Sequence, residues 1–271
     1  MSSTAHSPSF ATHRWADWRT TDFASIDPAR TVAVLPLGAT EQHGPHLPLG
    51  VDTVLVEGVV NEAIGHLKAT DPVLFLPTLP IGLSVEHTGF AGTLSLSSQT
   101  TLAVWLELAA SVARAGVKKL LLFNAHGGHV GLMDVAAREM RGQHGLKVFG
   151  SSWYQLPLGA AMQAFSAHEQ RFGVHAGDVE TSMMLALAPE LVTMSAAQNF
   201  VSAATERATH FTLLGDGRSA KLGWHMQDYN PHGAAGDASD ATARKGQALL
   251  QEAGTQLAVL LRELIAFQPL V

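Results

Sequence analysis

Short apolar runs alternate with segments of helical periodicity over the first half of the chain, and this alternation constrains the fold more than any other feature. The runs predict buried strands over residues 31–37, 73–76, 118–124 and 146–154. The segments between them predict helices over residues 53–67, 99–115 and 130–141. Strands that alternate with helices form a mainly parallel sheet covered by helices on both faces. We therefore expect an α/β fold.

The second half of the chain predicts fewer regular elements. Residues 179–187 predict a helix that ends before Pro189, and residues 241–267 predict a long amphipathic helix that packs on the sheet. Residues 199–240 are rich in Gly and Pro and predict an irregular, functional loop region. Because no repeat, low-complexity tract or linker is visible, we expect residues 1–271 to form one domain.

Charge and hydropathy exclude several classes of partner. The formal net charge is −6 and no basic block occurs, so we expect no binding to nucleic acid. Although 46% of the residues are hydrophobic, no apolar run approaches the roughly 20 residues that span a bilayer, so we expect no membrane partner. Residues 1–12 are polar and do not resemble a secretory signal, which predicts a cytoplasmic location.

The chain contains 14 His and no Cys, so disulfides and thiolate metal sites are excluded. Any metal ion must be held by imidazole and carboxylate groups, which suit Zn²⁺, Mn²⁺ or Fe²⁺. A scatter of surface histidines would explain the count equally well. The spacing of these residues along the chain has to decide between the two interpretations.

Polar residues collect after the predicted strands, where open α/β sheets bind their ligands. The loop after the first strand contains Glu41, His43 and, after a Pro/Gly-rich stretch, Asp52. His126 follows the third strand. Together these four side chains make a suitable ligand set for Zn²⁺ or Mn²⁺, and a shared carboxylate could bridge two ions. The alternative is that Glu41 and Asp52 cap local structure and that His126 is an ordinary residue at the end of a strand.

Several long motifs in this order resemble the creatininase family of metal-dependent amidohydrolases. They are GATEQHGPHLPLGVD (38–52), GLSVEHTGFAGTLSL (82–96), NAHGG (124–128), HAGDVETS (175–182) and GDASDATARKG (236–246). The resemblance implies a three-layer α/β/α sandwich, usually assembled as a homo-oligomeric hexamer, and a small-molecule substrate. It also implies a centre of two divalent metal ions.

The resemblance assigns roles to individual residues of this chain. Glu41 and His126 would hold one ion and His43 the other, with Asp52 between them. In addition, Ser84 falls where family members touch the substrate. His175 falls at the position of the catalytic base, and Glu180 lies beside it.

The chain departs from creatininase itself in three respects. Gly128 stands where creatininase has a glutamate for the second ion, and Gly127 stands where it has a tyrosine. The second ion therefore needs another ligand, for which Glu180 is the first candidate, before Asp178 and His129. A tryptophan of creatininase is also missing near Arg171. These differences argue against creatinine as the substrate.

Further residues are candidates for the walls of a substrate pocket. Glu86 and His87 either contact the substrate or form a hydrogen-bonded pair within their loop. Trp153 is a third candidate, because it matches another tryptophan of the family. Trp224 and Tyr229 lie in the irregular region and could line either a pocket or a subunit interface, and the sequence does not choose between these.

The predicted function is hydrolysis of a C–N bond in a small cyclic amide or a formamide through a metal-activated water. His175 would carry a proton to the leaving nitrogen. Glu180 would orient His175 or bind metal. Two alternatives stay open: a family member that opens a lactone or cyclic ketone, and a catalytically idle protein that binds metal and a small molecule.

Overall fold

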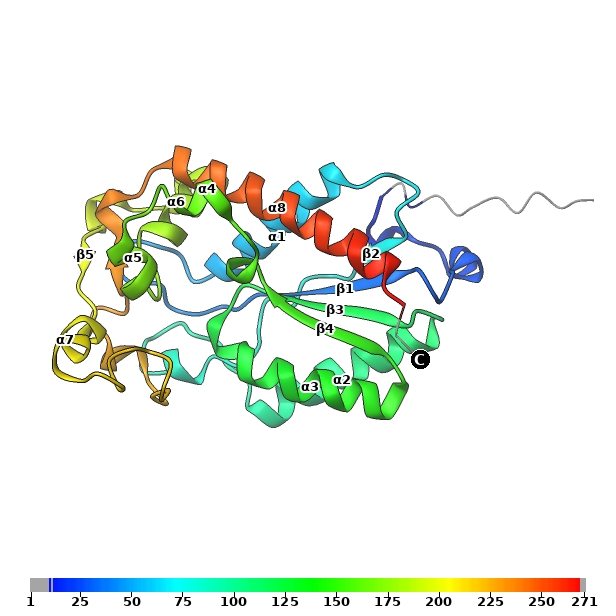
Figure 1. The fold of residues 1–271 in the computed structure, drawn as a ribbon, viewed down its shortest axis with the longest axis horizontal. Helices are drawn as coiled ribbons and strands as arrows, with labels where there is room; N and C mark the ends of the chain where they lie inside the picture. Colours follow the sequence, from blue (N-terminus) through cyan, green and yellow to red (C-terminus); the bar gives the residue numbers. More distant parts are fainter. Residues whose placement is uncertain (1–9, 11, 269–271) are drawn as a thin grey trace, which may run out of the picture.

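The computed structural model describes residues 10 and 12–268 and contains a four-stranded parallel sheet (Figure 1). The strands are β1 (Val32–Leu37), β2 (Val73–Phe75), β3 (Lys119–Asn124) and β4 (Lys147–Ser152), in the spatial order β2-β1-β3-β4. Each corresponds to a predicted strand, although β4 ends two residues earlier than predicted. Val32 of β1 pairs with Val73 on one side and Lys119 on the other. The parallel sheet confirms the expected fold class.

Helices cover both faces of the sheet, as Figure 1 shows. Val32 and Val34 point to the face that is covered by α1 (Val51–His66), α6 (Asp178–Leu187) and α8 (Ala243–Ala266). Ala33 and Leu35 point to the other face, which is covered by α2 (Ser98–Arg114) and α3 (Val130–His144). Because successive side chains of a strand point to opposite faces, a run of continuously apolar residues is required when both faces are buried. The result is the expected three-layer α/β/α sandwich.

Short elements gather at one end of the molecule, beyond the carboxyl ends of the strands (Figure 1). They are α4 (Gly159–Met162), α5 (Ala167–Phe172), α7 (Ala203–His210) and the antiparallel pair β5 (Asn199–Phe200) and β6 (Gly236–Asp237). The prediction that residues 199–240 are irregular throughout is wrong for α7, β5 and β6, although it holds for most of the segment. Single 3-10 turns connect many of the elements, among them Val85–His87, Gly127–His129 and Trp153–Gln155.

A lysine is buried inside the sandwich. Lys119 begins β3 and is fully buried, and its Nζ donates to the carbonyl oxygens of Leu264 (2.7 Å) and Ile265 (3.0 Å). These carbonyls belong to the last turn of α8, where backbone acceptors have no partner within the helix. The lysine therefore joins the central sheet to the C-terminal end of α8.

Helix α1 begins one residue before Asp52, with Gly50 at its N-cap. Asp52 therefore lies within the first helical turn, which directs its carboxylate toward the carboxyl end of the sheet. The segment 1–12, predicted to carry no secretory signal, lies almost wholly outside the described residues. None of the helices in the described part of the chain is long and apolar enough to cross a membrane.

Candidate metal centre and active site

A cavity of about 450 Å³ opens at the carboxyl end of the sheet. We call it the active-site cavity. The loops after β1 and β3 and the start of α6 all reach its wall, as the sequence predicts for an open α/β sheet. Five of its lining residues are the predicted metal ligands and proton carriers Glu41, Asp52, His126, His175 and Glu180. His43 lies directly behind this wall and is fully buried.

The first of two ligand clusters consists of Glu41, Asp52 and His126. His126 Nδ1 lies 3.2 Å from Glu41 Oε2 and 3.4 Å from Asp52 Oδ2. The other ring nitrogen of His126, Nε2, donates to the carbonyl oxygen of Leu83 at 2.9 Å. That bond directs the lone pair of Nδ1 at the two carboxylates, which is the tautomer that a metal ligand needs.

The second cluster consists of His43 and Glu180, and His175 lies beside them. His43 Nδ1 donates to the carbonyl oxygen of Glu41 at 3.0 Å, so Nε2 is the nitrogen left for a ligand. This Nε2 lies 3.7 Å from Asp52 Oδ1 and 4.0 Å from Glu180 Oε2. Asp52 thus turns one oxygen toward each cluster, as a bridging carboxylate would.

A divalent ion fits the donor atoms of both clusters. His43 Nε2 and Asp52 Oδ2 are buried and make no hydrogen bond within the described residues. Buried polar atoms are rarely left without a partner, because desolvation then goes uncompensated. A positive ion between the clusters would satisfy both atoms.

Two alternative ligands for the second ion are already engaged elsewhere. Asp178 accepts from Ser182 Oγ at 2.9 Å and pairs with Lys245 Nζ at 2.5 Å. His129 uses both ring nitrogens, since Nε2 accepts from the Leu83 amide and Nδ1 bonds to Asn124 Oδ1, each at 3.1 Å. Glu180 alone of the three faces His43.

Burial and mutual charge shift the pKa values of the clustered groups. Burial lowers the pKa of His43, but the carboxylates of Asp52, Glu180 and Glu41 outweigh it and raise that pKa to about 9. Burial, with a smaller contribution from the Asp52 charge, raises the pKa of Glu180 to about 7. Burial opposes the charged form of His126 as well, yet Glu41 and Asp52 hold its pKa well above the usual value. In the metal-free site, His43 and His126 therefore hold protons on the nitrogen atoms that would bind a metal ion.

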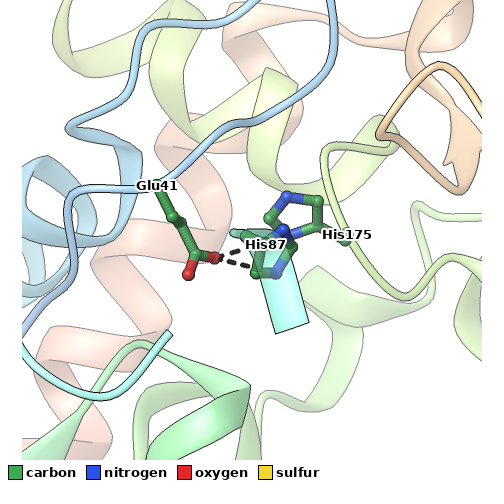
Figure 2. A group of neighbouring side chains, drawn as sticks. All are labelled: Glu41, His87 and His175. Carbon is green, nitrogen blue, oxygen red and sulfur yellow. Dashed lines mark ion pairs between the residues drawn. The ribbon is translucent and has the colours of Figure 1, made fainter. Parts of the chain in front are cut away.

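Figure 2 shows Glu41 with His87 and His175, which approach it from the same side. His87 Nε2 lies 3.3 Å and His175 Nδ1 3.8 Å from Glu41 Oε1. Gln42 controls this arrangement. Its amide oxygen accepts from the Gly44 N–H at 3.0 Å, so its NH₂ group faces His87 Nδ1 at 2.7 Å. His87 then presents an Nε2–H to Glu41.

His175 is held in one tautomer by the backbone. Its Nε2 donates to the carbonyl oxygen of Gln42 at 2.7 Å, which leaves a lone pair on Nδ1. Burial, together with the nearby His43 and His87, lowers the pKa of His175 well below its usual value, so the ring is neutral and able to accept a proton. The next residue, Ala176, has φ +53°, a strained conformation for a side chain with Cβ, and its N–H donates to Glu180 Oε2 at 2.5 Å.

The residues predicted to contact substrate divide into two groups. Glu86, His87 and Trp153 line the active-site cavity. Ser84 is fully buried behind Glu41, donates its hydroxyl to Glu41 Oε2 and is not among the lining residues. Ser84 therefore holds the Glu41 carboxylate in place.

The space beside Gly128, where creatininase has a glutamate, is filled by the Glu86 carboxylate. Glu86 Oε1 lies 3.3 Å from His126 Nε2, in space that a Cβ at Gly128 would enter. A side chain at Gly128 would therefore collide with the Glu86 carboxylate. Glu86 therefore contacts the ring nitrogen of His126 that does not face Glu41 and Asp52.

The structure gives two residues of the site contacts that the sequence did not predict. Gln42 stands between two predicted ligands, and that position was its only signal. Trp224 lines the active-site cavity, and its ring packs edge-on against His87 (6.1 Å between centroids) and Tyr229 (5.1 Å). Trp224 therefore lines the pocket, which is one of the two places that the sequence left open for it.

Comparison with known proteins agrees with this geometry. The creatininase family profile, described as creatinine amidohydrolase, matches residues 16–261. The chain belongs to the creatininase family. A mycofactocin precursor peptide peptidase of Mycobacterium ulcerans is 32% identical over 81% of this chain and 80% of its own length. A creatinine amidohydrolase of Pseudomonas putida is 34% identical over 59% of this chain and 66% of its own length.

Solved creatininases share the fold. One creatinine amidohydrolase superposes with a TM-score of 0.74 at 26% identity, over 96% of this chain and 100% of its own. A creatininase variant of Zn–Zn type and a creatininase with Mn match with TM-scores of 0.74 and 0.73, each at 25% identity, over 95% and 94% of this chain and 99% of their own. The recognised resemblance is therefore confirmed, and this chain is a creatininase-family hydrolase with residues able to bind metal.

Proposed function

We propose that this protein is a metal-dependent amidohydrolase that cleaves the C–N bond of a small cyclic amide or a formamide. The observation that carries the proposal is the position of Asp52. Its two oxygens face separate clusters, each with a histidine nitrogen whose lone pair is directed inward by a backbone hydrogen bond. Such a site suits two divalent ions that share one carboxylate.

Glu41, Asp52 and His126 would hold one ion, and His43, Asp52 and Glu180 the other. The Zn–Zn and Mn forms of related creatininases make Zn²⁺ and Mn²⁺ the first candidates, and the ligand set also accepts Fe²⁺. When bound, the two ions lower the pKa of water toward about 7 and polarise a carbonyl group.

The protein's own groups then supply proton transfer and orientation. Water forms a bond to the amide carbon, and His175 Nδ1 takes the proton that the water loses. The C–N bond breaks as His175 returns this proton to the leaving nitrogen. The Gln42 carbonyl keeps the proton on His175 Nε2 throughout, so Nδ1 is always the transferring atom. Glu180 serves as metal ligand and, through the Ala176 amide, fixes the backbone beside His175.

The walls of the cavity offer both aromatic and polar groups for recognition of an amide. Trp153 and Trp224 provide aromatic surface. Glu86 Oε1 is buried and makes no hydrogen bond within the described residues, so it can accept an N–H of the substrate. His87 lies beside it, and Ser84 supports the site indirectly by fixing Glu41.

The experiment is chelator-sensitive turnover of cyclic amides and formamides, with metal analysis of protein purified without chelator. We expect about two divalent ions per chain and activity that returns when Zn²⁺ or Mn²⁺ is restored. Protein without metal would contradict the proposal. Lactones and cyclic ketones in the same screen test the alternative of another ring, and absence of any chelator-sensitive turnover would favour a catalytically idle binding protein.

A peptide amide is a second candidate substrate, because one relative is named as a peptidase of a precursor peptide and a groove continues beyond the cavity. The homo-oligomeric hexamer and the cytoplasmic location, both expected from the sequence, stay predictions. Light scattering of the purified protein would test the first.

A further inference from the structure

A second groove, of about 560 Å³, adjoins the active-site cavity. Its lining includes Arg171, Val174, Arg207, Lys221, Trp224 and Tyr229. Val174 and Trp224 also line the active-site cavity, so the two spaces share a wall. A substrate that extends past this wall from the metal clusters would enter the second groove.

The two spaces have opposite charge. No Lys or Arg occurs among the described residues that line the active-site cavity, whereas five carboxylates do: Glu41, Asp52, Glu86, Glu169 and Glu180. The second groove has three cationic side chains and a single carboxylate, Asp216. Asp216 is occupied by its own turn, because it accepts from the backbone amides of Arg218 (2.7 Å) and Ser219 (2.8 Å).

The cationic groups of the second groove are not neutralised. Within residues 10 and 12–268, neither Arg171, Arg207 nor Lys221 lies within ion-pair distance of a carboxylate. The Arg207 guanidinium lies over the Tyr229 ring, 5.3 Å from its centroid, and the Arg171 guanidinium over the Phe172 ring at 4.8 Å. Aromatic faces orient a guanidinium without consuming its charge, so its N–H donors stay available for an anion.

We propose that the second groove is a subsite for an anionic group of the substrate. The substrate class is then an amide that extends from the metal clusters across Val174 and Trp224 and ends in a carboxylate or a phosphate near Arg171 and Arg207. Guanidinium groups bind both anions through paired N–H donors. This inference rests on the proposed function for the amide, but the anion subsite can be tested without turnover.

The test is calorimetric binding of three probes to the metal-loaded protein: tetraglycine with a free carboxylate, tetraglycine amide, and glycylglycyl-O-phosphoserine amide. We expect at least one anionic probe to bind about tenfold more tightly than the neutral amide, with an advantage that falls as salt rises. The ranking of the carboxylate and phosphate probes identifies which anion the groove prefers.

Variants locate the effect. Arg171→Ala and Arg207→Ala should each abolish most of the advantage of the anionic probe and leave the neutral amide unchanged. Arg207→Lys should restore part of it, because charge returns without the paired donors. Arg218→Ala is the matched control, since Arg218 lies in the same segment but is not among the lining residues, and its binding should equal that of the unmodified protein.

The outcomes separate the inference from the proposed function. Equal binding of all three probes, or no binding of any, overturns the anion subsite. So does an anionic advantage that survives both arginine substitutions. If the arginine-dependent advantage is found but no amide is hydrolysed in a chelator-sensitive way, the groove stands as an anion site and the amidohydrolase proposal falls.

Discussion

Loading of the metal-free protein with Zn²⁺ should depend steeply on pH between 7 and 8. The cause is His43, whose pKa is raised to about 9 by the surrounding carboxylates despite its burial. At pH 8 about ten molecules carry the proton on this ring for each one that does not, and at pH 7 about a hundred do. Since only the neutral imidazole binds metal, uptake must displace this proton.

The magnitude follows from that ratio. Each unit of pH lost below 9 should weaken binding at the His43 cluster by about tenfold, or about 1.4 kcal/mol. Glu180, with a pKa of about 7, adds a fraction of a proton at the lower end of the range. His126, whose pKa is also raised, adds a proton at the other cluster. The sign is the same in every case: uptake improves as pH rises toward these pKa values.

The assay is calorimetric titration with Zn²⁺ at pH 7 and pH 8, each in two buffers of different ionisation enthalpy, which counts the protons released. His43→Gln is the control, because it should lower proton release at pH 7 by about one per chain. The reasoning is refuted if affinity is equal at the two pH values and no protons are released.

Three further predictions concern the same site. Asp52→Ala should lose both ions, as measured by elemental analysis, and with them all activity. Retention of two ions per chain would contradict the role of Asp52 as a shared ligand. His175→Ala should keep its metal and lose turnover by about 10²–10⁴-fold, whereas an undiminished rate would remove it from proton transfer. Gly128→Ala should lower metal affinity by about 10–100-fold, because its Cβ collides with Glu86 beside a ligand histidine. Gly127→Ala, whose Cβ would meet nothing within 4 Å, should leave affinity unchanged in the same chelator competition.

The sheet and its five long helices could be predicted because their signal is local. A strand buried on both faces must be apolar at every position, as β1 is, and an amphipathic helix repeats its apolar face along its own length. The short helix α7 was missed because it buries no residue and contains no large apolar side chain. Lys119 shows the limit within a strand, because its partner is the end of a helix 145 residues away.

Sequence alone determined the types of ligand at this site, because without cysteine only histidine and carboxylate could bind a metal ion, and the motifs placed them after the strands. Tertiary structure decided how they are used. In the folded protein, the two oxygens of Asp52 face different clusters. Asp178 forms an ion pair with Lys245 and so does not face His43. The Gln42 carbonyl fixes the tautomer of His175. Such choices depend on distances of a few ångströms between loops far apart in the chain, which no local pattern records.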